Sequence, residues 1–166
     1  MRAVHAAVAA GLLLRLAFGL GYWTGKPLTH DEREYLTLAA NIAQGRGFAT
    51  ELPGETPSST VQTFGRGPGY PVFLAPLTWL DADLRAGRQP ADVPAAVKIV
   101  QAILGAGAIL VLSGLVRRVA GDRAGAAAAW IAALFPPLVW MPAYALSEQL
   151  YSLLALACAA WLGRVT

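Results

Sequence analysis

Four side chains that could carry protons lie together in the sequence THDERE, residues 29–34. They are His30, Asp31, Glu32 and Glu34. A carboxylate can act as a general base when it lies within hydrogen-bond reach of a substrate proton. The preceding segment, AVHAAVAAGLLLRLAFGLGYW, is almost entirely apolar and could cross a bilayer. The pattern therefore predicts carboxylates held just outside a membrane.

The composition favours a membrane protein. Of the 166 residues, 56% are apolar and 14% are charged, and the mean hydropathy is +0.50. A soluble domain has about 25% charged residues. The net charge of +3 comes without a basic block, so nucleic-acid binding has no support. Cys158 is the single cysteine, which leaves no disulfide framework and no metal-binding spacing.

Four apolar segments predict an all-α, multi-pass membrane module that spans the whole chain. Their ranges are 3–23, 93–116, 124–141 and 143–162. At 1.5 Å per residue the first is about 30 Å long, enough for one crossing. A cleaved signal peptide is the alternative for this segment, but its apolar core would be about 7 to 15 residues long and end in an A-x-A-like site. We favour an uncleaved helix, and expect Pro136 and Pro137 to break the far end of the third segment.

The arginines of the short loops predict the orientation. With four crossings they fall on one side, which the positive-inside rule makes cytoplasmic; they are Arg2, Arg117, Arg118, Arg123 and Arg164. The N-terminus is then cytoplasmic, in an inner (plasma) membrane, and residues 24–92 form an external loop. Glu148, at the start of the fourth span, would share the external surface.

The external loop should contain short surface helices. Thr29 and Glu32 have capping-box spacing, and apolar residues at helical spacing predict an amphipathic helix from Asp31 to Gln44. Pro71, in GRGPGYPVFLAPL, can start a second short helix. Between them, a small hairpin around PGE is possible (residues 53–55).

Arg15 lies midway along the first apolar segment. A cation at that depth costs about 2.5 to 3.5 kcal/mol on insertion scales. We expect it to pair with a carboxylate inside the helix bundle, with snorkelling as the alternative.

The order of several motifs resembles the N-terminal part of a GT-C glycosyltransferase of family 39, the type of protein O-mannosyltransferases and aminoarabinose transferases. These motifs are an Arg-containing first span, then DEREYLTLAANIAQGRGF, RGPGYPVFLAPL, VKIVQAILGAGAILVLSGLVRRVAGDRAG and ALSEQLYSLLALA. Members of that family are several times longer. We therefore expect this chain to be a fragment that is inactive on its own.

The resemblance implies an inverting transfer of a sugar from a polyprenyl-phosphate donor on the external face. The acceptor would be a lipid, glycan or protein. Asp31 matches the proposed catalytic base of the family, and Glu32 lies beside it. Arg66 and Lys98 are candidates to stabilise the leaving phosphate. Gly67 departs from the R-P-P-G-Y-P pattern of relatives, which loosens the loop that holds Arg66.

The resemblance implies less defined roles for other residues. Tyr70 and Glu148 are further candidates for substrate binding, Glu148 by holding the acceptor or positioning Arg66. Some relatives bind a divalent metal near this site, but the sequence contains no clear ligand set, and no cofactor is certain. Glu34 is expected on a solvated helix face.

Two other classes of protein remain open. One is a non-catalytic remnant or scaffold, since four spans enclose little volume. The other is a transporter, for which Arg15 and the Pro136–Pro137 break could be pathway elements.

Overall fold

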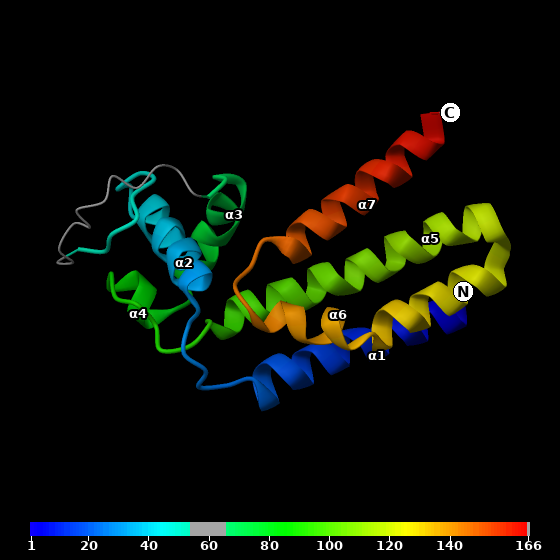
Figure 1. Cartoon of the computed structure of the whole chain (residues 1–166), viewed down its shortest axis with the longest axis horizontal. Coiled ribbons are helices and arrows are strands. Elements are labelled where there is room, and N and C mark those ends of the chain that lie inside the picture. The colour runs from blue at the N-terminus through cyan, green and yellow to red at the C-terminus, as the bar shows by residue number, and fades with distance from the viewer. Residues whose placement is uncertain (54–65, 166) are drawn as a thin grey trace. The chain divides into compact units, whose positions relative to one another are not determined.

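The computed structural model describes residues 1–53 and 66–165, which contain helices and no strand (Figure 1). The expected all-α class is confirmed for this part of the chain. The possible hairpin around PGE lies outside the described residues. The chain forms two compact units: residues 1–24 with 98–166, called unit 1, and residues 25–97, called unit 2.

Unit 1 begins with α1 (Arg2–Leu16), which continues as a π-helical turn, η1 (Ala17–Tyr22). A π-helical turn adds a residue to the helical repeat and is frequently found at functional sites. The Phe18 ring stacks on Trp23 just after this turn, with 5.8 Å between the centroids. The apolar segment is therefore helical along nearly its whole predicted length.

The long helix α5 (Ala95–Leu134) is a helical hairpin. Gly121 has φ 86° and ψ 174°, a conformation that breaks the helix and that glycine alone adopts readily. Figure 1 shows the chain reversing here and running back. Across the reversal, the Ser113 hydroxyl donates to the carbonyl of Gly125 at 2.9 Å, so the two arms lie side by side. The reversal falls between the second and third predicted segments.

The second arm ends as the proline pair predicts. Its helix stops at Leu134, and Phe135 is extended because a residue that precedes proline avoids the helical region. A short α6 (Pro136–Trp140) and a 3₁₀ turn, η2 (Met141–Ala143), follow. The last helix, α7 (Glu148–Val165), starts later than the predicted segment 143–162.

Small residues let the helices of unit 1 approach closely. A buried cluster joins α1 to both arms of α5; its members are Ala7, Ile109, Ala129, Ala132 and Ala133. A Cβ atom added at Gly11 would lie 2.8 Å from Ile109 and 3.1 Å from Ala133. The helices of unit 1 thus pack closely through small residues, mostly alanine and glycine. Such packing is enriched between membrane helices.

Within residues 1–53 and 66–165, two helices are long and apolar enough to cross a membrane, Arg2–Tyr22 and Ala95–Leu134. Only 22% and 33% of their most apolar windows are buried inside the protein. Most of this apolar surface is therefore left uncovered by the described chain. Length and composition suggest membrane association, and the number of crossings belongs to the proposal below.

Unit 2 is built from α2 (His30–Ala43), α3 (Gly69–Thr78) and the single turn α4 (Ala82–Arg85). The helix predicted from Asp31 to Gln44 is therefore confirmed within one residue at each end. The middle of α2 is buried all around, from Tyr35 to Asn41, and Leu36 and Leu38 are almost fully covered. The Gly25 amide donates to the carboxylate of Asp92 at 2.8 Å, which ties together the two ends of the unit.

Candidate functional site

The start of α2 is a complete capping box. Thr29 is the N-cap, and its hydroxyl accepts from the backbone amide of Glu32. The Glu32 carboxylate accepts from the Thr29 amide and hydroxyl, both at 2.7 Å. Glu32 is also 2% exposed. The structure thus gives Glu32 a local capping function and leaves little of its carboxylate accessible to a substrate.

Arg66 connects the carboxylates of Asp31 and Glu34. Its Nε donates to Glu34 at 2.6 Å, and its Nη2 pairs with Asp31. Asp31 and Glu34 are three residues apart and therefore lie on the same face of α2. Arg66 comes from the segment just before α3, so the ion pairs bring together two of the sequence motifs.

The two carboxylates differ in exposure. The Asp31 side chain is 48% exposed, whereas that of Glu34 is 17% exposed. The expectation that Glu34 belongs to a solvated face is therefore wrong. Glu34 and Asp31 share a helix face. The cation that covers Glu34 is Arg66, which lies 32 residues further along the chain and could not be assigned from local spacing. Of the two carboxylates, Asp31 is the one that a substrate can reach more easily.

The rings of Tyr35 and Tyr70 pack next to Arg66 and each other. The centre of its guanidinium lies 5.2 Å from the centroid of the Tyr35 ring, within the range of a cation–π contact. Tyr35 meets Tyr70 edge to face, with 4.9 Å between the centroids. Tyr70 is only 5% exposed. Tyr70, expected to bind substrate, therefore supports the site by packing α3 against α2.

The charges keep Arg66 cationic. Hydrogen bonding to Glu34 and then to Asp31 raises the pKa of Arg66 above its ordinary value, and partial burial opposes this increase. Nη1 of Arg66 makes no hydrogen bond to another residue that the structure describes. The site thus combines a fixed cation, a half-exposed carboxylate and a guanidinium nitrogen able to donate to a further anion.

An apolar cavity of about 520 Å³ adjoins Arg66 within unit 2. Its other lining residues are Ile42, Gly47, Phe48, Pro68 and Val72. Its volume lies in the range of small-molecule sites, about 300 to 1,000 Å³. A ligand with an apolar part could therefore lie beside the guanidinium.

Lys98 and Glu148 belong to unit 1, unlike Asp31 and Arg66. Lys98 is 4% exposed, and its Nζ donates to the Trp23 carbonyl at 2.7 Å. Glu148 is the exposed first residue of α7. Lys98 thus binds the backbone just after η1, while Glu148 faces away from the packed interior of unit 1.

Arg15 is buried, as expected, but its hydrogen-bond partners are backbone carbonyls and not the expected carboxylate. It is 2% exposed and donates to the carbonyls of Gly11 at 2.9 Å, Ala132 at 3.2 Å and Ala133 at 3.4 Å. The expected carboxylate is absent from its surroundings among the described residues. Carbonyls replace it because Ala132 and Ala133 lie in the last turn of the second arm of α5, where helix carbonyls lack their usual amide donors.

The described residues contain no group of three or more His, Cys, Asp and Glu side chains that could hold a metal ion. Comparison of the chain with family models, curated proteins and solved structures finds no match.

Proposed function

We propose that this chain is the N-terminal module of a membrane glycosyltransferase of the GT-C type. The enzyme would transfer a sugar from a polyprenyl phosphate to an acceptor outside the inner membrane. The acceptor oxygen or nitrogen attacks the anomeric carbon as the bond from that carbon to the phosphate oxygen breaks. The acceptor proton passes to the Asp31 carboxylate, and the phosphate leaves with the bonding electrons. Attack opposite the leaving group inverts the anomeric centre.

One observation carries this proposal: the ion pair between Asp31 and Arg66. A base and a phosphate-binding cation must lie within one substrate's length of each other, and these two residues are adjacent although 35 positions separate them. Glu34 holds the Nε side of Arg66, which leaves the Nη1 side available for a leaving phosphate. The cavity beside Arg66 offers an apolar surface for the substrate.

The topology forms part of the proposal. Crossings by α1 with η1, the two arms of α5, and α7 would place unit 2 outside and the turn at Gly121 inside. The lipid tail of the donor would then stay in the membrane, with its sugar presented to Asp31. No step is assigned to a metal.

The test is Asp31→Asn in the longest natural reading frame that contains this sequence. Loss of a general base lowers a rate by about 10²- to 10⁴-fold. The assay follows the release of polyprenyl phosphate from a labelled lipid-linked sugar in membranes. Arg33→Ala is the matched control, because Arg33 is an exposed neighbour on the same helical turn. Full turnover by Asp31→Asn, with normal insertion, would remove Asp31 from catalysis.

A structural role is the second candidate, and the same ion pairs support it. Arg66 joins α2 to the segment before α3, which a scaffold would also require. The two candidates predict different behaviour of Arg66→Lys. If Arg66 is catalytic, lysine retains the charge but loses the forked geometry. Turnover should then fall while the thermal stability changes little. A scaffold loses stability and has no turnover to lose.

A further inference from the structure

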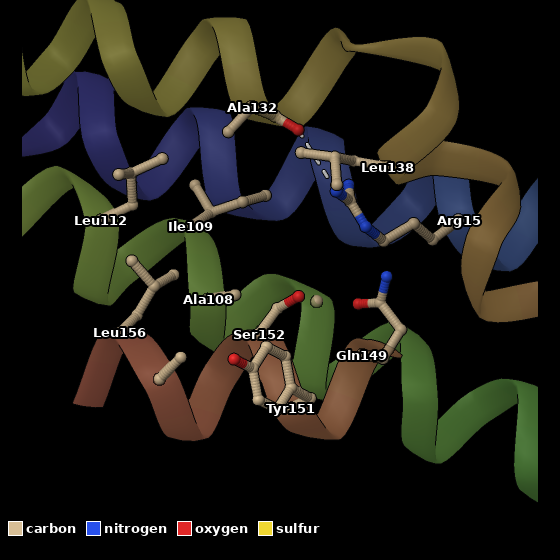
Figure 2. A pocket seen from close by; sticks show the side chains of 12 residues that line it. Arg15, Ala108, Ile109, Leu112, Ala132, Leu138, Gln149, Tyr151, Ser152 and Leu156 are labelled. Carbon is tan, nitrogen blue, oxygen red and sulfur yellow. Dashed lines mark hydrogen bonds between the residues drawn. The ribbon is translucent and has the colours of Figure 1, made fainter. Parts of the chain in front are cut away.

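A second cavity, of about 370 Å³, lies inside unit 1. It is a partly open cavity lined by residues of α1, both arms of α5, α6 and α7, and the carboxylate site of unit 2 contributes nothing to it. Figure 2 shows Arg15 and Gln149 together at one end of this cavity, with Leu112 and Leu156 at the other. Ser152 lies between the two ends. The cavity is thus polar at one end and apolar along the rest.

The polar end holds a charge without a counter-ion. Arg15 is 2% exposed, and its three hydrogen bonds go to neutral backbone carbonyls. Its Nε–H has no hydrogen-bond partner in the part of the chain that the structure describes. A buried, unpaired donor on a charged group destabilises the folded state, because it has lost its hydrogen bond to water. Such a cost is usually offset by a partner, which the described chain does not provide.

Gly105 lets the side chains of Arg15 and Gln149 pack directly against the backbone of α5. A Cβ added there would lie 2.8 Å from Nε of Arg15 and 2.9 Å from Oε1 of Gln149. Gln149 is itself 3% exposed. The absence of a side chain at this position allows the guanidinium and the amide to face each other across the end of the cavity.

We propose that this cavity binds a single-chain amphiphile with an oxyanion head group. The head group would accept hydrogen bonds from the guanidinium of Arg15 and from either the Gln149 amide or the Ser152 hydroxyl. The hydrocarbon chain would lie along Ile109, Leu112 and Leu156. A volume near the lower end of the range for small-molecule sites fits one chain better than a two-chain phospholipid. The binding site does not depend on the proposed transferase function.

Either a carboxylate or a phosphate supplies the required head group. The experiment uses the purified chain in nanodiscs of zwitterionic lipid, with a dodecanoate that carries a photoreactive diazirine near its methyl end. After illumination, mass spectrometry maps the labelled residues. Dodecanoate, dodecyl phosphate and dodecanol are added as competitors. We expect labelling on α5 and α7 around Leu112 and Leu156, and competition by the anions but not by the alcohol.

The stronger of the two anionic competitors identifies the head group. Competition by dodecanol equal to that by dodecanoate would overturn the proposal, because it would show partition into an apolar gap without recognition of charge. Labelling spread evenly over the outer surfaces of the helices would overturn it too.

Glycine variants on one helix provide a matched pair. Gly105→Ala should weaken competition by dodecanoate about tenfold, because the new methyl group intrudes between Arg15 and Gln149. Gly107→Ala is the control: its Cβ would approach Leu153 no closer than 3.6 Å, an ordinary contact. Equal competition in the two variants would contradict the proposal.

A second pair tests the apolar end without changing Arg15. Leu156→Trp should fill the cavity and abolish specific labelling, whereas Leu154→Trp places the same ring at an exposed position of α7. Circular dichroism confirms that both variants are folded.

Arg15→Gln should lose the preference for anions over the alcohol, and retention of that preference would assign the recognition elsewhere.

Discussion

At the scale of single residues, Arg66 holds two carboxylates that would otherwise repel each other. Asp31 and Glu34 lie one turn apart on α2, and both pair with the same guanidinium. The arrangement places Asp31 beside a cation while about half of its side chain stays accessible. Glu34 is more deeply covered and has the better geometry for fixing the position of Arg66.

The two ion pairs should differ in strength. Double-mutant cycles with Arg66→Met, combined with Glu34→Gln or Asp31→Asn, should give a coupling of about 1 kcal/mol for Glu34 and about half of that for Asp31. The difference follows from exposure, since solvent and salt screen Asp31 more. Thermal unfolding in detergent at low and high salt measures both. A stronger coupling for Asp31 would contradict the assigned roles.

Between about pH 6 and 9, the contribution of Arg66 to stability should be constant. Glu34 first, and then Asp31, raise its pKa in the folded protein. A group with a raised folded pKa stabilises fully below its unfolded pKa, and this stabilisation is lost only as the pH rises through the folded value. For arginine both values lie far above pH 9. Comparing the thermal unfolding of the native chain with Arg66→Met over this pH range provides the measurement; a difference that changes steeply would point to other titrating groups.

At the scale of elements, local sequence determines where helices begin and reverse. The capping box starts α2 directly before the site and orients its first turn. Gly121 separates the two arms of α5. Both features are short, and each can be tested by one substitution with a neighbour as the control.

Removing the N-cap should destabilise α2. Thr29→Ala eliminates the hydroxyl that accepts from the amide of Glu32 and donates to its carboxylate, which should cost about 1 kcal/mol. Arg33→Ala, on the exposed side of the same turn, should change stability by less than about 0.5 kcal/mol. Chemical denaturation followed by circular dichroism measures both. Similar effects in the two variants would show that the cap contributes little.

The reversal at Gly121 should require glycine. Gly121→Ala forces a side chain into a conformation with φ 86° and ψ 174°, at a cost of about 1 to 3 kcal/mol. Gly114→Ala, in the interior of the helix with nothing within 4 Å of the new Cβ, should be neutral or stabilising by up to about 1 kcal/mol. Thermal unfolding of the two variants gives the comparison. A harmless Gly121→Ala would indicate that the two arms join through a different geometry.

At the scale of the whole molecule, the proposed function depends on sidedness. The Asp31 site must face outward, and the turn at Gly121 must face the cytoplasm. The largely uncovered apolar surfaces of α1 and α5 are compatible with lipid around unit 1. Which side each end reaches is a separate question that chemical labelling can answer.

Cysteine labelling tests the orientation in intact cells. In a Cys158→Ala background, Arg33→Cys should react with a membrane-impermeant maleimide from outside. Asp122→Cys, beside the turn at Gly121 and 90% exposed, should react only after permeabilisation. The positive-inside distribution of arginines is the reason for this expectation. Labelling of both positions from one side would reject the topology and, with it, the external transferase site.

Much of the local structure could be predicted from the chain alone. The capping box, the helix that it starts, the reversal between the arms of α5 and the break at Pro136 all arise from contacts within a few residues or from backbone preferences. The partners of charged residues could not be predicted as well. Glu34 pairs with Arg66, and two of the three partners of Arg15 are the carbonyls of Ala132 and Ala133, so these partners lie far away in sequence.

The sequence by itself determined the all-helical class, the apolar segments and the start of α2, since hydrophobic periodicity, capping and proline act locally. Only the tertiary structure decided that Arg66 joins Asp31 to Glu34 and that Arg15 meets the backbone of Ala132 and Ala133. The physical reason is that a long cationic side chain can satisfy its charge with carboxylates or with carbonyl oxygens. The packing of distant segments determines which of them lies within reach.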